Sequence, residues 1–343
     1  MTSLERQDID EILNGIRWEK FVSKNVLVTG ATGAMARYVV HVLMEINRRI
    51  DDKGKVIVLC RNENKAKKCF IDYLEDSSFQ IMVGAVEEPI KLCDRIDFIF
   101  HAAGMSASKY FKSNPVEILS ANTVGTYNVL ELAKEKKVEG VLFFSSCAVI
   151  GKLTDDYYKY TGVNPAESRN CYIVGKRVGE NLCAAYYDEY NVPAKIVRIG
   201  YSFGPYVDLD DGHLFSDFLK SIINRETLVI KGTGKNYLGL CYVTDAVRAF
   251  FKIIVDGDSK TPYVMRNQEE VYTIESIAHI LTTEVFFNRH LSYACETING
   301  EEQEFTPIMP KLLMDLGWKP EVSLAEGFRR AVAIIEDNQD KQQ

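Results

Sequence analysis

The segment Val26–Ala36, which reads VLVTGATGAMA, decides the fold of this 343-residue chain. Its first four residues form an apolar, β-branched run typical of a buried strand, and glycines follow that run. Gly30 permits a tight turn, Gly33 lets the backbone approach a pyrophosphate, and Ala36 allows a helix to pack closely on the sheet. The segment therefore predicts a strand, a phosphate-binding turn and a helix whose N-terminus faces an anion.

The alternation of strand and helix patterns continues from about Lys24 to Gly204. Short runs, apolar nearly throughout, lie at Asn25–Thr29, Lys55–Leu59, Phe79–Val83, Phe98–His101, Gly140–Ser145 and Ala194–Ile199. Longer helical patterns occupy Ala34–Arg48, Pro115–Glu135 and Tyr172–Tyr190. Such runs are typical of strands buried on both faces. We therefore predict an α/β fold of the Rossmann type, with a doubly wound parallel sheet.

Two further parts of the protein are predicted, one before and one after this alternating region. Residues 1–22 carry apolar side chains at helical spacing, which predicts an amphipathic helix before a dinucleotide-binding domain over 23–204. Beyond Gly204 the rhythm becomes irregular, and residues 205–343 predict a smaller α/β substrate lobe with some elements interleaved with the larger domain. Helices are expected in that lobe at Phe215–Asn224, Thr244–Val255, Thr273–Leu281 and Leu324–Asp337.

Composition narrows the classes of partner. A formal net charge of -7 without a basic stripe disfavours a nucleic-acid partner. No apolar run is long enough for a signal peptide core or a membrane span. The eight cysteines are scattered without a CxxC pair, which favours reduced thiols over a disulfide frame or a metal site. We expect a cytoplasmic protein that acts on a small molecule, with no nucleic acid, membrane or metal partner.

The glycine-rich turn is expected to contact the cofactor. Backbone groups of Gly30, Thr32, Gly33, Ala34 and Met35 would surround the pyrophosphate of a dinucleotide.

The end of the second strand bears on which dinucleotide is bound. NAD sites place an acid there to bond the ribose 2′-OH, but here Val58 and Leu59 run into Cys60-Arg61-Asn62. Arg61 would pair with a 2′-phosphate, although a solvated surface role is the alternative. We expect NAD(P), with NADP slightly favoured over NAD.

Tyr172 and Lys176 are the predicted centre of the chemistry. They lie four residues apart and hence on one helical face, and a nearby ammonium favours the phenolate over the phenol. Ser146 ends a predicted strand, where the carboxyl ends of parallel strands meet the ligand crevice. We therefore predict Ser146, Tyr172 and Lys176 as catalytic residues, with the tyrosine as general acid and base.

These motifs together resemble the extended short-chain dehydrogenases/reductases, the branch rich in nucleotide-sugar epimerases, dehydratases and decarboxylases. The resemblance spans Lys24 to Ala331, and the stretch CYIVGKRVGENLC at Cys171–Cys183 is especially similar to UDP-glucuronate decarboxylases. Its further motifs are Thr29–Gly33, His101–Gly104, Asn122–Thr126, Ser145-Ser146 with Gly151, Arg198–Pro205, Tyr242–Asp245 and Leu316–Pro320.

The resemblance implies roles for single residues. Tyr172 would remove a hydroxyl proton while hydride passes to the nicotinamide, and Lys176 would bond the nicotinamide ribose. Ala102, Ala103 and Asn122 would line the cofactor side. Helices near 115–135 and 172–190 resemble those that form the dimer interface of the family, so a homodimer is expected. The expected substrate contacts are Ser146, Cys147, Tyr201, His213 and Lys235.

The sequence departs from the family pattern directly after Ser146. Dehydratases of the family carry Asp-Glu there and decarboxylases carry a Glu at the second position, whereas this chain has Cys147-Ala148. Neither side chain supplies a carboxylate, which leaves oxidation and reduction of a carbinol.

A second departure from the family pattern concerns the residues that bind the diphosphate of a nucleotide-sugar substrate. Two positions where the family places an arginine are occupied by Leu238 and Phe305. Because a guanidinium is a strong phosphate clamp, their absence weakens the nucleotide-sugar interpretation. The cations that would replace them are Lys231, Lys235, Arg266 and Lys311.

Several functions stay open. The leading hypothesis is an NAD(P)-dependent nucleotide-sugar epimerase that works through a transient keto-sugar. The alternative is an NADP(H)-dependent reductase or dehydrogenase of a keto-sugar or polyol, with or without a nucleotide attached. A dehydratase or decarboxylase ranks lower, and an inactive dinucleotide-binding sensor ranks last.

Overall fold

The protein is built around a seven-stranded sheet in the order β11-β6-β5-β4-β1-β2-β3. Its computed structural model describes residues 1–105, 110–150, 163–296 and 309–341. Every neighbouring pair in this sheet is parallel, which confirms the predicted doubly wound α/β fold. The strands are β1 Val26–Thr29, β2 Val56–Cys60, β3 Phe79–Val83, β4 Phe98–His101, β5 Gly140–Ser146, β6 Ala194–Ile199 and β11 Pro262–Met265.

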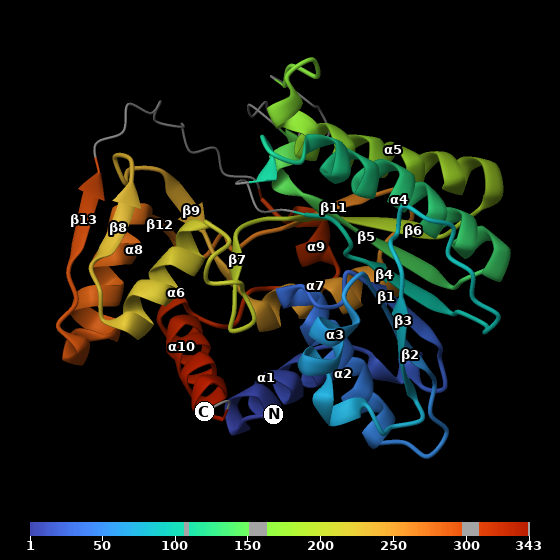
Figure 1. Cartoon of the computed structure of the whole chain (residues 1–343), viewed down its shortest axis with the longest axis horizontal. Coiled ribbons are helices and arrows are strands. Elements are labelled where there is room, and N and C mark those ends of the chain that lie inside the picture. The colour runs from blue at the N-terminus through green and yellow to red at the C-terminus, as the bar shows by residue number, and fades with distance from the viewer. Residues whose placement is uncertain (106–109, 151–162, 297–308, 342–343) are drawn as a thin grey trace.

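Helices cover both faces of the sheet (Figure 1). Alternate residues of β1 point to opposite sides: Val26 and Val28 join one core, and Leu27 joins the other. The first core contains α2 (Ala34–Arg48) and α7 (Val243–Asp256), and the second contains α4 (Pro115–Lys136) and α5 (Cys171–Tyr190). Burial on both faces explains why the strands are continuous apolar runs.

The chain after residue 205 contributes to both parts of the molecule. It supplies strand β11 to the large sheet and helix α7 to one of its faces, and the remaining elements lie mainly beside that sheet (Figure 1). Three two-stranded ladders, β7–β10, β9–β12 and β8–β13, belong to this second region. Its elements, with the preceding strand β7, are β7 Ser202–Phe203, α6 Leu214–Asn224, β8 Leu228–Lys231, β9 Tyr237–Gly239, β10 Cys241–Tyr242, β12 Val271–Thr273, α8 Ile274–Ile280, β13 Tyr293–Glu296, α9 Lys311–Asp315 and α10 Leu324–Asp340.

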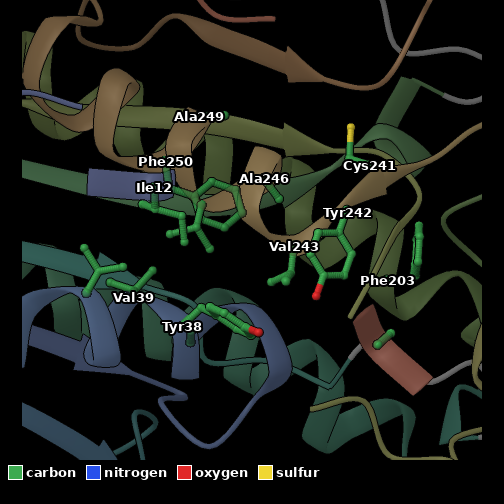
Figure 2. Close-up of a cluster of buried hydrophobic side chains, with 14 of the residues drawn as sticks. Ile12, Tyr38, Val39, Phe203, Cys241, Tyr242, Val243, Ala246, Ala249 and Phe250 are labelled. Carbon is green, nitrogen blue, oxygen red and sulfur yellow. The ribbon is translucent and has the colours of Figure 1, made fainter. Parts of the chain in front are cut away.

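The N-terminal segment forms α1 over Ser3–Asn14, followed by a short 3₁₀ turn at Trp18–Phe21. Thr2 and Glu5 form a capping box at its start. Its apolar face joins the core with α2 and α7, and Figure 2 shows Ile12 close to Val39 and Phe250. A further short helix, α3 (Glu63–Cys69), follows β2. Among the described residues, no helix is both long and apolar enough to cross a membrane.

Asp8 of α1 joins three elements that are distant in sequence. Its carboxylate accepts hydrogen bonds from the hydroxyls of Tyr38 in α2 and Tyr242 in β10, each at 2.8 Å. Arg330 of α10 donates to its other oxygen at 3.0 Å. Both sides of this ion pair are buried, so the carboxylate compensates three buried donors at once.

We predict that Asp8→Ala lowers the free energy of unfolding by about 3–5 kcal/mol, because it leaves the buried guanidinium and two phenols without their acceptor. Urea unfolding at neutral pH measures this loss. Asp10→Ala is the matched control, since Asp10 lies on the same helix in an exposed pair with Arg49 and should cost at most about 1 kcal/mol. Equal losses in the two variants would contradict the role given to Asp8.

Candidate active site

The predicted phosphate turn lies where β1 and β4 run side by side at the point of reversal in strand order. Gly30 has a φ of +64°, and a Cβ at this position would lie 2.7 Å from the backbone nitrogen of Ala103. Gly33 caps α2 and has no side chain to occupy the first amides of that helix. Ala34 and Met35 begin α2, so their backbone groups are placed at a helix N-terminus suited to an anion.

A buried histidine holds this turn against the end of β4. His101 shares hydrogen bonds with Thr29 at 2.8 Å and with Thr126 of α4 at 3.1 Å. Burial lowers the pKa of His101 to about 3, so the imidazole is neutral. Thr29 also accepts from the amide of Ala103 at 3.2 Å. The predicted cofactor residues Ala102 and Ala103 therefore continue directly from a rigid buried network.

The hydroxyl of Ser146 lies near enough to the phenol of Tyr172 to influence its pKa. Ser146 ends β5 and Tyr172 lies in the first turn of α5, so two separate elements bring them together. Burial raises the pKa of Tyr172, while the Ser146 hydroxyl acts in the opposite direction. Phe111 stacks on the phenol ring, with ring centroids 5.2 Å apart and planes inclined by 13°.

Lys176 lies one helical turn below Tyr172 and is buried. Its Nζ donates to the carbonyl of Phe144 at 2.6 Å and lies 5.8 Å from the centre of the Tyr172 ring. Burial lowers the pKa of Lys176 to about 7, against the opposing charge of Glu180. The protonation of this side chain is therefore sensitive to whatever enters the site.

Asn122 of α4 adds a polar atom beside Lys176. Its Nδ2 donates to the carbonyl of Ile118 at 2.8 Å, while its Oδ1 is buried and has no hydrogen-bond partner in the described chain. A Cβ on Gly104 would lie 2.9 Å from this Oδ1 and 3.4 Å from Nζ of Lys176. The acceptor and the ammonium thus border one small space kept open by a glycine, which fits the hydroxyls of a ribose.

Sequence reasoning did not identify the ion pair beneath this site. Arg198 of β6 and Glu180 of α5 are both buried and form two hydrogen bonds, at 2.7 and 2.9 Å. Ser145 donates to the same carboxylate at 2.6 Å. The available signal was the position of Glu180, four residues after Lys176 on the same helical face.

The remaining predicted residues are more dispersed. Arg61 follows β2 and pairs with Glu117 of α4. Cys147 lies directly beyond Ser146, and its thiol donates to the carbonyl of Arg198 at 3.3 Å. Tyr201 follows β6 and is 53% exposed, and its ring is nearly perpendicular to that of Phe215.

Two further predicted substrate contacts lie in the second region. His213 is the exposed residue before α6, and Lys235 is exposed between β8 and β9. Leu238 is buried in the core. Gly151 and Phe305 lie outside the described residues. Within those residues, no group of three or more His, Cys, Asp or Glu is placed to hold a metal ion.

We predict that Lys176→Met changes stability in a pH-dependent way. The lysine has its pKa lowered from about 10.5 to about 7, so the folded state binds fewer protons than the unfolded state between these values. The unfolding free energy of the wild type should therefore rise relative to the variant as pH increases from 7 to 10, by up to about 1.4 kcal/mol per unit. Below pH 7 the difference should be constant.

Denaturant unfolding of both proteins at several pH values, without added dinucleotide, measures this difference. Lys65→Met removes an exposed ammonium from α3 and controls for the loss of one charge. A difference between wild type and Lys176→Met that does not vary with pH would contradict the lowered pKa.

A family model described as the NAD dependent epimerase/dehydratase family matches residues 26–266. UDP-glucuronic acid decarboxylase 6 of Arabidopsis thaliana is 29% identical over 323 residues, which cover 91% of this chain and 90% of the relative. UDP-glucuronic acid decarboxylase 1 of Danio rerio is 29% identical over 322 residues, covering 91% of this chain and 74% of the relative.

Solved structures show the same fold. The UDP-glucuronic acid 4-epimerase of Bacillus cereus, in complex with UDP-glucuronic acid and NAD, superposes with a TM-score of 0.76 at 20% identity. The UDP-glucose 4-epimerase of Thermotoga maritima, with UDP-glucose, superposes with a TM-score of 0.75 at 21% identity. Each comparison covers 92% of this chain and 99% of the other. With the family model spanning most of the chain and the predicted motifs gathered at one edge of the sheet, this chain belongs to the NAD-dependent epimerase/dehydratase family of enzymes.

Proposed function

We propose that this protein is an NAD(P)-dependent nucleotide-sugar epimerase that works through a transient keto-sugar. The observation that carries this proposal is the placement of Ser146 beside the phenol of Tyr172, one helical turn from the buried Lys176. Relatives and structural neighbours named for UDP-sugars support the substrate class. We further propose that the region after residue 205 supplies most of the substrate lobe.

The side chains suit reversible oxidation of a carbinol. Ser146 and Tyr172 would hold the carbinol oxygen between them, and Tyr172 would take its proton. Bound dinucleotide would supply the hydride acceptor. For Tyr172 to act as a base, its raised pKa has to fall, and the positive charge of Lys176 near the ring acts in that direction. Lys176 and Asn122 would orient the ribose of the cofactor.

The two residues after Ser146 support a reaction in which the keto-sugar is reduced again, without elimination of water or loss of a carboxylate. Burial raises the pKa of the Cys147 thiol to about 12, so it is a neutral group and a poor base. Ala148 offers only a methyl group where decarboxylases of the family carry a glutamate. Neither residue supplies the acid–base pair that elimination of water needs.

The second candidate is a keto-sugar or polyol reductase that uses NADP(H). Arg61 favoured it on sequence grounds, and its position after β2 is compatible with a 2′-phosphate. Glu117, however, pairs with Arg61, and its carboxylate would repel a phosphate. A phosphate would have to displace Glu117, so we favour NAD as the retained cofactor.

Incubation of the purified protein with a panel of UDP-sugars, followed by NMR, tests the function. We expect an epimer to accumulate with retained dinucleotide and no net change in absorbance at the NADH band. Stoichiometric oxidation of added NADPH would instead support the reductase.

We predict that Tyr172→Phe retains dinucleotide binding and loses turnover by about 10²–10⁴-fold, because general acid–base catalysis contributes about this much. Dinucleotide content and epimer formation are measured on the same preparation. Tyr187→Phe, which removes a hydroxyl further along α5, is the control and should retain turnover. Unchanged turnover in Tyr172→Phe would remove this residue from the mechanism.

We also propose a homodimer through α4 and α5. Apolar side chains on these two helices remain exposed: Val116, Leu119, Val124, Tyr127, Val178 and Tyr190. A grouping of this kind is typical of a surface that another chain covers. The eight free cysteines support a reducing compartment such as the cytoplasm.

We predict that the double variant Val124→Glu/Tyr127→Glu sediments as a monomer, while the wild type sediments as a dimer. Two carboxylates would be desolvated at the interface without a partner. Ile71→Glu, at a 68% exposed position outside α4 and α5, is the control and should stay dimeric. A wild type that is monomeric at micromolar concentration would refute the dimer.

A further inference from the structure

Phe111 covers one face of the Tyr172 ring. The two rings are nearly parallel, with planes inclined by 13° and centroids 5.2 Å apart, a geometry that aromatic pairs favour. Phe111 lies in the turn before α4, whereas Tyr172 lies in the first turn of α5. No local sequence pattern brings these two rings together, so the contact depends on how α4 and α5 pack.

The turn that carries Phe111 is held against the start of α5. The thiol of Cys171 donates to the carbonyl of Phe111 at 3.8 Å, so two successive residues of α5 contact its main chain and its ring. A main-chain hydrogen bond of 2.9 Å closes the turn over residues 110–114. The two helices also approach closely, since a Cβ on Gly175 would lie 2.9 Å from Cβ of Asn122. The position of the Phe111 ring is therefore fixed by the helix pair that carries the site.

The stack limits the movement that would take the phenol oxygen of Tyr172 out of the site. That oxygen lies on the χ2 axis, so a ring flip leaves it in place, whereas rotation about χ1 carries it away. Because Phe111 fills the space on one side of the ring, rotation toward that side is blocked. Ser146 lies near the hydroxyl, and Nζ of Lys176 lies 5.8 Å from the ring centre. The hydroxyl is therefore held where two polar groups act on it.

The Phe111 ring also makes the surroundings of the phenol less polar. Burial raises the pKa of Tyr172, and a lower effective dielectric constant strengthens the attraction between a phenolate and a nearby ammonium. The ionisable groups near the phenol include Lys176 and Cys171 on the same helix and Cys147 beyond β5. Burial raises the pKa of both thiols, so they are neutral. Phe111 therefore makes the ionisation of Tyr172 depend more strongly on Lys176.

We propose that Phe111 is a positioning residue for the reaction, whose ring keeps the Tyr172 hydroxyl beside Ser146 and excludes water from one face of the phenol. This deepens the proposed function and rests on its assignment of Tyr172 as acid and base. Phe111 has no group that exchanges a proton, so it acts only through Tyr172. The competing interpretation is a ring that blocks the site and has to leave before substrate binds, and the test separates the two.

The first measurement is the titration of the phenol in the full chain carrying 3-fluorotyrosine at position 172 alone, followed by fluorine NMR without substrate. We expect the phenol of Phe111→Ala to titrate about one pH unit lower than that of the protein with Phe111, because water reaches the exposed face. Phe111→Tyr keeps a ring at this position, so its phenol at position 172 should titrate as it does beside Phe111.

The second measurement is turnover of the unlabelled protein. We expect Phe111→Ala to lower kcat about 2- to 10-fold with an unchanged KM, the range of one aromatic contact. Phe111→Tyr should keep the wild-type kcat. Phe287→Ala is the control, because it removes a 67% exposed ring outside α4 and α5, and it should change neither the titration nor kcat.

Thermal unfolding and dinucleotide content establish that each variant is folded. Phe111→Leu, which keeps an apolar side chain without a flat ring, takes the place of Phe111→Ala in both measurements if the alanine variant unfolds. An unchanged titration would overturn the exclusion of water, and an unchanged kcat would overturn the positioning role. A higher kcat would show that the ring blocks the site and would overturn the proposal as well.

The titration is independent of turnover. A protein that forms no epimer but shows the lower titration in Phe111→Ala would refute the epimerase and leave the role of Phe111 at the phenol standing. An active epimerase whose phenol titrates alike in both forms would do the reverse.

Discussion

The close approach of β1 to the end of β4 is the constraint on which the site depends. Gly30 turns the chain with a positive φ, and its hydrogen faces the backbone of Ala103 where any side chain would collide. The strand order reverses at this place, and the ends of strands at such a reversal are the usual location of ligands. Buried side chains of His101 and Thr29 share a hydrogen bond that holds the ends of the two strands together. The predicted phosphate turn and the end of β4 are therefore one rigid unit.

Buried charged residues have two different roles in the rest of the molecule. The Glu180–Arg198 pair is satisfied within the protein, with Ser145 as a further donor, and it supports β5 and α5 from below. Asp8 and Arg330 do the same between α1 and α10, where the two ends of the chain meet (Figure 1). Lys176 differs, because burial lowers its pKa to about 7. Groups held at such a cost are typical of sites that bind a ligand.

Much of this arrangement followed from local sequence patterns. The turn at Gly30 and Gly33, the strand ending at Ser146 and the helix carrying Tyr172 and Lys176 all depend on short-range rules of spacing and composition. The predicted helices of the second region also lie close to their observed bounds. The predicted strands did not include β11, because its place in the sheet depends on pairing with β6 across the intervening chain.

The sequence by itself determined the parallel sheet, the phosphate turn and the predicted catalytic triplet, since periodicity and glycine positions act over a few residues. Only the tertiary structure decided which partners these residues meet. It brought Ser146 near Tyr172 and Asn122 near Lys176, and it paired Arg61 with Glu117. Such contacts join residues distant in sequence, and they depend on strand order and helix packing, which no local pattern encodes.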